Sequence, residues 1–504
     1  MKETTMYDYI ILGAGSAGCV LANRLTENLE TSVLLLEAGG NDDLPAIHDA
    51  TAAPSLLQTA VDWAYFTEEE PHLKHRKIYH PRGKVLGGSS STNFMTYARG
   101  NQHDYDDWQE LGNKGWSYAD VLPYFKKAEN WESGTSDYRG VGGPINVTDP
   151  SSINPLTEAF IEAGVELGWP RNNDYNGASQ GGFGFHQSTV HHGKRSSTAD
   201  GYLHPAENRP NLVVWMNTLV TRVLFEGTRA VGIAYLKDGK EQQERVNKEV
   251  ILSGGVFNSP QTLLLSGVGP ADQLRALDIR VVSHVPGVGH NLQDHPGFDM
   301  FFATKPSFTQ HGNEPGGIAF MKTQPDFPDA DLQLLFCPFF LFPTVPGKGY
   351  TIVVLATQPQ SRGHLTLRST DPTQPPAIFA NYLAHEADQQ TLVKGMKLVR
   401  RLAQTTSFAR YTERETIPGS QVQSDAQIVE FLRENVRTIS HPVGTCKMGH
   451  DEMAVVDEQL RVRGVEGLRV VDASIMPIIP HGNTNAPTIM IAEKVADMIA
   501  HNVQ

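Results

Sequence analysis

Three glycines near the start of the chain have a spacing that can receive a phosphate. Gly13, Gly15 and Gly18 follow the apolar run at residues 9–12, and Glu37 lies 19 residues after Gly18, at the end of a second apolar run. The first glycine permits a tight turn, the second admits a pyrophosphate to the backbone, and the third lets helix and strand pack closely. The pattern predicts a dinucleotide-binding βαβ unit, and an acid at Glu37 favours FAD or NAD over NADP. The alternative is a glycine-rich turn that only permits tight packing.

A histidine near the C-terminal end could act as a base. His441 precedes Pro442, and a residue before proline is held extended. When hydride leaves an alcohol carbon, a nearby group must take the hydroxyl proton, and a histidine with a pKa near neutrality can do so. The chain has 19 histidines, most of which are expected to be structural, so a packing role is the alternative for His441.

The C-terminal tail places polar side chains before a helix. A predicted strand ends at Asp472, and a polar stretch containing Asn483 and Asn485 leads to a helix expected to begin at or just after Pro487. The N-terminus of such a helix favours negative charge, which a reduced flavin carries. The alternative is an ordinary C-terminal helix with both asparagines as turn and cap residues.

Paired glycines follow one predicted strand. Gly254 and Gly255 allow a ligand close to the backbone, before a helix expected to start at Ser259 and Pro260. The alternative is an ordinary strand–helix turn.

Two sets of strands are expected. Asp238-Gly239 indicates a two-residue hairpin. Strands are predicted at residues 9–12, 33–36, 212–215, 220–226, 230–237, 249–253 and 468–471, and a second set without a glycine fingerprint at 318–322, 332–336, 351–357 and 363–367. Helices are predicted at residues 19–25, 104–129, 259–266, 386–405, 424–435 and 487–501.

The composition is that of an ordinary globular protein. With 504 residues the chain is expected to form two or more domains, and its net charge of −14 argues against a nucleic-acid partner. Three cysteines (Cys19, Cys337 and Cys446) give no disulfide framework and no zinc spacing. Together with the absence of a secretory segment and of a membrane-spanning apolar run, they predict a cytoplasmic location.

Two further motifs are rejected. Gly177-Ala-Ser179-Gln-Gly181 matches the pattern of a nucleophile elbow but lies in a Gly/Asn-rich loop instead of between a strand and a helix. His191-His192 has no partner at a metal-ligand spacing, so no metal is expected. A second GxGxxG pattern is also missing, which argues against a separate NAD domain.

Taken together, these segments resemble the glucose–methanol–choline (GMC) oxidoreductase family. The resemblance covers the chain in order: the N-terminal GAGSAG, the loop RGKVLGGSSSTN at residues 82–93, residues 255–269, His441-Pro442 and the GNTNAPT tail. Its choline-dehydrogenase-like branch is the most similar.

The resemblance implies an FAD enzyme that oxidises an alcohol to an aldehyde by hydride transfer to flavin N5. His441 matches the family's catalytic base, and Asn483 matches the position that hydrogen-bonds the substrate oxygen. The cofactor-binding residues expected are Gly13, Gly15, Ser16, Ala17, Gly18, Glu37, Ala38, Gly87, Gly88, Asn93, Met95, Val220, Asp472, Ala473, Asn483, Asn485 and Thr488.

The fold class expected is α/β combined with α+β. A discontinuous Rossmann-like FAD-binding domain is predicted from residues 1–110, 188–296 and 425–504. A substrate-binding domain, built on an antiparallel sheet with helices, is predicted from residues 111–187 and 297–424.

Departures from the family pattern refine these expectations. Thr92 stands where covalently flavinylated members carry histidine, so FAD is expected to be non-covalent. The stretch Asp294-His-Pro296-Gly-Phe298 lacks the cysteine of light-driven fatty-acid decarboxylases, which disfavours that chemistry. Ser440 replaces the Trp or Tyr that often precedes the active histidine.

The substrate is less constrained. The aromatic run at residues 336–343 could wall a pocket for an aryl or aliphatic primary alcohol, or could be ordinary core. Asp299 and Glu314 are candidates, by region only, for binding a choline ammonium. Dioxygen or another electron acceptor and the oligomeric state are left open. The alternatives are a hydroxynitrile-lyase-like enzyme without net redox chemistry and a non-catalytic flavin-binding protein.

Overall fold

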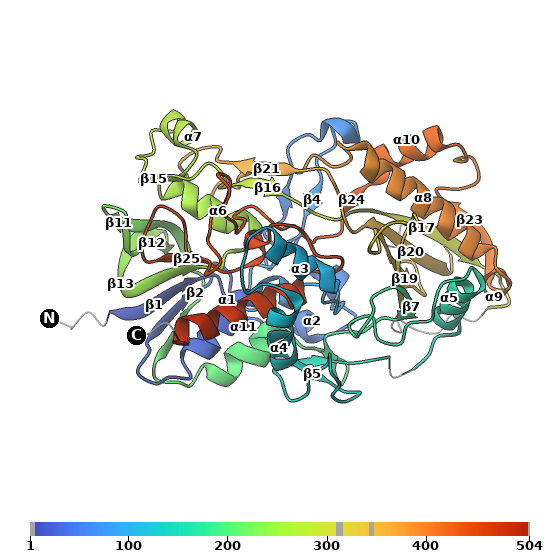
Figure 1. Ribbon diagram of the computed structural model, residues 1–504, viewed down its shortest axis with the longest axis horizontal. Coiled ribbons are helices and arrows are strands. Elements are labelled where there is room, and N and C mark those ends of the chain that lie inside the picture. The colour runs from blue at the N-terminus through green and yellow to red at the C-terminus, as the bar shows by residue number, and fades with distance from the viewer. Residues whose placement is uncertain (1–5, 151, 309–315, 342–346, 502–504) are drawn as a thin grey trace.

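Two seven-stranded sheets organise the part of the chain that the structure describes. The computed structural model covers residues 6–150, 152–308, 316–341 and 347–501. Figure 1 shows the first sheet, with β1, β2 and β13, at one end of the molecule and the second, with β17, β19 and β20, at the other.

The first sheet is mainly parallel and carries the nucleotide-binding fingerprint. Its strand order is β10-β2-β1-β13-β12-β11, with β25 beside β13. Strands β2 and β25 and most of β1 are buried, as expected for the centre of a sheet covered on both faces, whereas β10 at the edge is mostly half-buried. The strands are β1 (Tyr7–Leu12), β2 (Val33–Leu36), β10 (Leu212–Trp215), β11 (Leu219–Glu226), β12 (Arg229–Lys237), β13 (Lys240–Leu252) and β25 (Leu468–Val470).

Helices from opposite ends of the chain cover this sheet. Helix α1 (Ser16–Leu25) packs against α11 (Asn485–His501), which also contacts α4 (Tyr118–Ala128). A buried ion pair joins the first two, since the Arg24 Nη2 lies 2.7 Å from Glu493 Oε1. The C-terminal helix therefore completes the layer that the N-terminal fingerprint begins.

The second sheet is antiparallel, with the order β23-β17-β20-β19-β18-β7 and β24 beside β17. Helix α8 (Glu386–Ala403) contacts β20 and β19, and α5 (Pro155–Glu166) contacts β7 and β18. The strands are β7 (Gly182–Phe185), β17 (Pro296–Thr304), β18 (Gly317–Met321), β19 (Leu332–Cys337), β20 (Gly349–Ala356), β23 (Thr412–Ile417) and β24 (Arg437–Thr438).

Short elements fill the connections. The strands are β3 (Tyr65–Phe66), β4 (Tyr79–His80), β5 (Glu129–Trp131), β6 (Ile145–Val147), β8 (Val190–His191), β9 (Lys194–Arg195), β14 (Val268–Gly269), β15 (Ser283–His284), β16 (His290–Leu292), β21 (Gly363–Thr366) and β22 (Ala377–Phe379). The helices are α2 (Pro45–His48), α3 (Gln102–Glu110), α6 (Gly255–Leu265), α7 (Ala271–Ala276), α9 (Thr406–Ala409) and α10 (Asp425–Asn435).

Three predicted elements differ from those observed. The strand expected at 249–253 is the end of the long β13, whose polar first half pairs with β12 through the predicted Asp238-Gly239 hairpin. The helix expected at 104–129 is two helices, because Gly112 and Gly115 between them adopt positive φ. The strand at 363–367 belongs to a separate three-stranded sheet with β16 and β22.

Two helices begin earlier than their prolines suggest. Helix α6 starts at Gly255, so Pro260 lies inside it and leaves the Val256 carbonyl without its usual N–H donor. The Thr445 hydroxyl donates to that carbonyl at 2.6 Å and restores the lost hydrogen bond. Helix α11 starts at Asn485, where Pro487 still falls in the first turn and removes no intrahelical bond.

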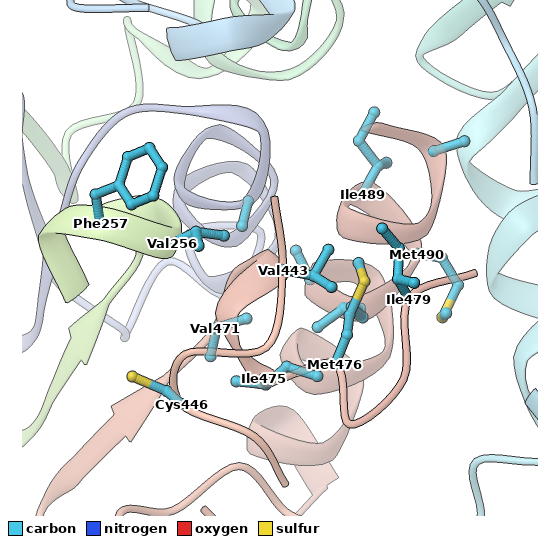
Figure 2. Packing of buried hydrophobic residues seen from close by; sticks show 14 of the residues in the cluster. Val256, Phe257, Val443, Cys446, Val471, Ile475, Met476, Ile479, Ile489 and Met490 are labelled. Carbon is cyan, nitrogen blue, oxygen red and sulfur yellow. The ribbon is translucent and has the colours of Figure 1, made fainter. Parts of the chain in front are cut away.

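A buried cluster supports the segment that follows His441. Figure 2 shows Val443 and Cys446 of this segment near Val256 of α6 and near Ile475 and Met476 of the tail. All five side chains are at most 3% exposed. The segment is therefore held by close packing on both sides.

The predicted domain boundaries remain a prediction. Strand β24 lies in the segment 425–504 that was predicted to bind the nucleotide, but it pairs with β17 of the second sheet. The strand that leads to His441 therefore belongs to the second sheet. Among the described residues, no helix has the length and apolar character needed to cross a membrane.

We predict that Gly18→Ala destabilises the protein. A Cβ at residue 18 would lie 1.9 Å from the Gly13 carbonyl oxygen, so α1 would have to move away from the turn. Overpacking of this kind costs about 1–3 kcal/mol, more than alanine's helix propensity returns. Thermal unfolding should show a lower Tm. Gly181→Ala is the control, because its Cβ would have no atom within 4 Å; an equal Tm for both variants would contradict the expectation.

Candidate active site

A cavity of about 1210 Å³ opens at the carboxyl ends of the parallel strands and reaches the second sheet. It exceeds the roughly 300–1,000 Å³ of most small-molecule pockets, so it can take a large cofactor together with a substrate. Most of the sequence-predicted site residues line it: Gly13, Gly15, Ser16, Ala17, Glu37, Ala38, Gly88, Asn93, Met95, Val220, His441, Asp472, Ala473, Asn483, Asn485 and Thr488.

Gly18 and Gly87 are the two predicted residues that do not line the cavity. Gly18 lies behind the turn, where it lets α1 approach Gly13. Gly87 has a φ of 81°, and its N–H donates to the Ala14 carbonyl at 2.7 Å. Both glycines shape the backbone that faces the cavity, but neither contributes to the cavity lining.

Glu37 closes the nucleotide-binding turn. Its carboxylate accepts from the backbone N–H of Ala14 at 2.9 Å and from that of Gly39 at 2.8 Å. Burial raises the pKa of Glu37 to about 7, although these backbone donors and Lys84 oppose the rise. A carboxylate has room for further donors, so Glu37 can also accept from ribose hydroxyls.

Three helix N-termini face the cavity. Its lining includes Ser16 at the start of α1, Gly255 at the start of α6 and Asn485 at the start of α11. The first and third are joined, since the Ser16 hydroxyl donates to Asn485 Oδ1 at 2.7 Å. Free N–H groups and the helix dipoles make these ends suitable for phosphates and for negative charge on a flavin.

Asp472 links α6 to the C-terminal segment. Its carboxylate accepts from the Gly255 N–H at 2.9 Å and from the Ser259 hydroxyl at 2.6 Å. Burial raises the pKa of Asp472, while these donors oppose the rise. The buried carboxylate thus fixes the N-terminus of α6 against the strand end.

His441 and Asn483 meet at the cavity wall. Asn483 Nδ2 lies 2.8 Å from His441 Nε2, and on its other side His441 Nδ1 lies 2.9 Å from His295 Nδ1. The Asn483 amide nitrogen can only donate, so Nε2 of His441 carries a lone pair and accepts from it. The arrangement offers one acceptor and one donor side by side.

The loop before His441 is held from two sides. The His441 N–H donates to Asp294 Oδ1 at 2.9 Å. Arg82 Nη2 donates at 2.6 Å to the carbonyl of Ser440, which adopts a φ of 67°, unusual for a residue with a side chain. These contacts fix the direction in which the imidazole projects.

The environment keeps His441 neutral. Burial lowers its pKa well below the usual 6.5, and the neighbouring His295 and the positive charge of Arg82 lower it further. Asp294, whose own pKa is raised by burial, binds the backbone N–H of His441 and not its ring. A neutral, buried imidazole whose Nε2 carries a lone pair is a competent base once a substrate hydroxyl reaches that nitrogen.

Sequence reasoning missed several residues of the site. His295 lies in a segment considered only for the cysteine that it lacks, and 146 residues separate it from His441. Gln333, on β19, donates to Asn483 Oδ1 at 3.4 Å, and no local pattern signals it. Arg82 is the first residue of the loop RGKVLGGSSSTN at residues 82–93, and this motif could have identified it.

Asp299, one of the two predicted ammonium-binding acids, does not line the cavity. Asp299 forms a bidentate pair with Arg437, at 2.8 and 3.0 Å. Glu314 lies outside the described residues, as do Phe342 and Pro343 of the predicted aromatic run. The rest of that run contributes Phe336, Cys337, Phe339, Phe340 and Leu341 to the cavity lining.

Family models match both parts of the chain. Residues 7–297 match the N-terminal and residues 359–492 the C-terminal model described as GMC oxidoreductase. The mitochondrial choline dehydrogenase of Mus musculus is 46% identical over 98% of this chain and 89% of its own length. An oxygen-dependent choline dehydrogenase of Pseudomonas syringae is also 46% identical, over 99% of this chain and 94% of its own length.

Solved structures agree with the sequence relatives. Pyridoxine 4-oxidase from Mesorbium loti superposes with a TM-score of 0.93 and 31% identity, covering 99% of this chain and 100% of that one. A formate oxidase of Aspergillus oryzae gives a TM-score of 0.92 and 28% identity, covering 99% and 98%. These relatives are oxidoreductases, and nothing among them supports the lyase alternative.

The cavity fits the cofactor of this family. Glycine backbone forms its floor where a Cβ at Gly13 would come within 2.6 Å of the Ser253 carbonyl oxygen. The three helix N-termini and Glu37 supply partners for phosphates and ribose. The fold class and the expected cofactor are confirmed: the chain belongs to the GMC oxidoreductase family and is an FAD-dependent alcohol oxidoreductase.

Proposed function

We propose that this protein oxidises a neutral primary alcohol with an apolar aryl or aliphatic body to the aldehyde. His441 is the base and Asn483 binds the substrate oxygen. FAD, held without a covalent bond, supplies the acceptor for the hydride that leaves the alcohol carbon. The observation that carries this proposal is the 2.8 Å contact between Asn483 Nδ2 and His441 Nε2 at the cavity wall.

A hydroxyl group matches this pair of side chains. It has one hydrogen to donate and lone pairs to accept with. By replacing the direct contact between the two side chains, it can give its hydrogen to His441 Nε2 and accept from Asn483 Nδ2. His441 then takes the proton as the carbon is oxidised, and the Asn483 amide stabilises negative charge that develops on the oxygen. Both roles follow from one hydrogen-bonding arrangement.

The lining near the base supports an apolar substrate body. Leu335, Phe339, Phe340, Val353 and Ile439 face the cavity from the second sheet and from the segment before His441. Among the described residues, the carboxylates that line the cavity are Glu37, Glu132, Asp149 and Asp472. None of the four is hydrogen-bonded to His441 or Asn483 in the described structure.

The proposal includes a non-covalent FAD, an electron acceptor that is dioxygen or another molecule, and a cytoplasmic location. Thr92, which lines the cavity, offers no nitrogen for a bond to the flavin and so supports non-covalent FAD. The electrons leave for dioxygen or another acceptor. All three cysteines are free, which supports a reducing, cytoplasmic location.

Replacing His441 tests the base. In His441→Ala the rate constant of flavin reduction by alcohol, measured by anaerobic stopped flow, should fall about 10²- to 10⁴-fold or more, since general-base help is lost. The FAD content, read from the visible absorption of the purified protein, should remain that of the wild type. His450→Ala is the control, because that side chain is 57% exposed. Rapid reduction in His441→Ala would refute the role.

The pH dependence should reflect the lowered pKa of His441. The unprotonated ring is the active form, so the rate is lost when the pH falls through that pKa. Because burial places it well below 6.5, flavin reduction should stay constant down to about pH 6.5 and decline only below it. Stopped-flow measurement of the flavin-reduction rate across this pH range shows where the rate begins to decline. A half-maximal rate above pH 6.5 contradicts a buried, neutral base.

An alcohol panel tests the substrate class. Burying a quaternary ammonium without a counter-charge costs several kcal/mol, so benzyl and medium-chain alcohols should exceed choline in kcat/KM by about 10-fold or more. Anaerobic bleaching of the flavin by each alcohol measures this without an assumed electron acceptor. A preference for choline, as the names of the sequence relatives suggest for them, would reject the neutral-substrate proposal and leave the alcohol oxidation itself intact.

A further inference from the structure

His295 contacts the candidate base from behind the cavity wall. It lies between β16 and β17, has no exposed surface and is absent from the cavity lining. Its Nδ1 lies 2.9 Å from His441 Nδ1, with the two rings nearly perpendicular at 87°. The Ile439 N–H donates to the His295 carbonyl at 3.1 Å, which fixes the spacing of the two histidines.

A backbone carbonyl determines which nitrogen of His295 carries the proton. His295 Nε2 lies 3.0 Å from the Thr357 carbonyl oxygen, which can only accept, so Nε2 carries the hydrogen. In a neutral ring Nδ1 is then a bare acceptor. The hydrogen between the two histidines therefore belongs to Nδ1 of His441, and Nε2 of His441 is left with the lone pair.

On the Nε2 side of His441, the hydrogen bonds run in the same donor-to-acceptor direction. Gln333 Nε2 donates to Asn483 Oδ1, which turns the amide nitrogen of Asn483 toward His441 Nε2. Gln333 lies on β19, and Thr357 directly follows β20, the strand that pairs with it. One pair of neighbouring strands thus anchors both ends of a chain in which each donor points the same way.

The surroundings keep His295 uncharged. Burial, together with the nearby His481, lowers the pKa of His295 to about 3. His481 is paired with Asp104, and this pairing raises its pKa despite burial, which favours a positive charge close by. A second buried charge on His295 is disfavoured.

We propose that His295 is a positioning residue for the alcohol oxidation: by accepting the Nδ1 hydrogen of His441 it keeps the Nε2 lone pair of His441 directed at the substrate hydroxyl. The proposal rests on the proposed role of His441 as the base. Without this acceptor, the ring proton of His441 is free to move from Nδ1 to Nε2. The Asn483 amide can then turn so that its oxygen accepts from Nε2. Nε2 is then a donor and cannot take a proton.

Two substitutions of similar size separate positioning from packing. His295→Leu removes the acceptor, and His295→Asn places an amide oxygen near the former Nδ1. With equal FAD content, His295→Leu should lower the rate constant of flavin reduction about 100-fold, a part of the general-base contribution. The Kd for the alcohol, obtained from the same stopped-flow series, should change little. His295→Asn should recover at least tenfold of the loss.

The tautomer itself can be read without turnover. In the holoenzyme labelled with [15N]histidine, the ring nitrogens of His441 are identified as the signals missing from His441→Asn. We expect a protonated Nδ1 and a bare Nε2 in the wild type and in His295→Asn, and a proton shifted to Nε2 in His295→Leu.

Each outcome decides the proposal. Equal reduction rates in His295→Leu and His295→Asn, or an unchanged His441 tautomer in His295→Leu, would overturn it. If His295→Leu does not fold, a protonated Nε2 of His441 in the wild type would still overturn it. Rapid turnover by His441→Ala defeats the proposed base instead, and the nitrogen spectra still report the effect of His295 separately.

Discussion

The buried carboxylate of Asp294 is the constraint on which the position of the base depends. It accepts from the His441 N–H and from the hydroxyls of Thr438 and Tyr382. A buried carboxylate is costly without such donors, so the elements that carry them are fixed relative to one another. Through this one group the start of β17, the strand β24 and the loop to His441 form a single unit.

The two halves of the cavity are made in different ways. The nucleotide half consists of backbone: glycines at the turn and the free N–H groups of three helices, which need no side chain to recognise phosphate. The half that we propose to be catalytic consists of side chains brought from distant positions, His441, Asn483 and His295. The hydrogen bonds among them end at the Thr357 carbonyl, directly after β20 of the second sheet. Chemistry therefore depends on the second sheet as much as binding depends on the first.

This difference explains what the sequence could predict. The glycine fingerprint, Glu37, the parallel strands and the hairpin at Asp238 are local patterns, and the structure has them. His441 and Asn483 were found through the family resemblance. His295 and Gln333 were not, because their partners lie 146 and 150 residues away and nothing near them in the sequence signals the contact. The early start of α6 likewise depends on Thr445, which is remote from Pro260 in the sequence.

Close packing beside the base limits where a side chain could be added on β17. Gly297 on β17 pairs with Arg437 of β24, and a Cβ there would lie 2.6 Å from Cδ1 of Ile439 and 2.8 Å from the Val354 carbonyl. A longer side chain at residue 297 would displace Ile439, two residues before His441. Asp299, two residues further along β17, is neutralised by Arg437 of the same strand pair. A side chain at residue 297 therefore requires the Ile439 side chain to turn and the Val354 carbonyl to shift.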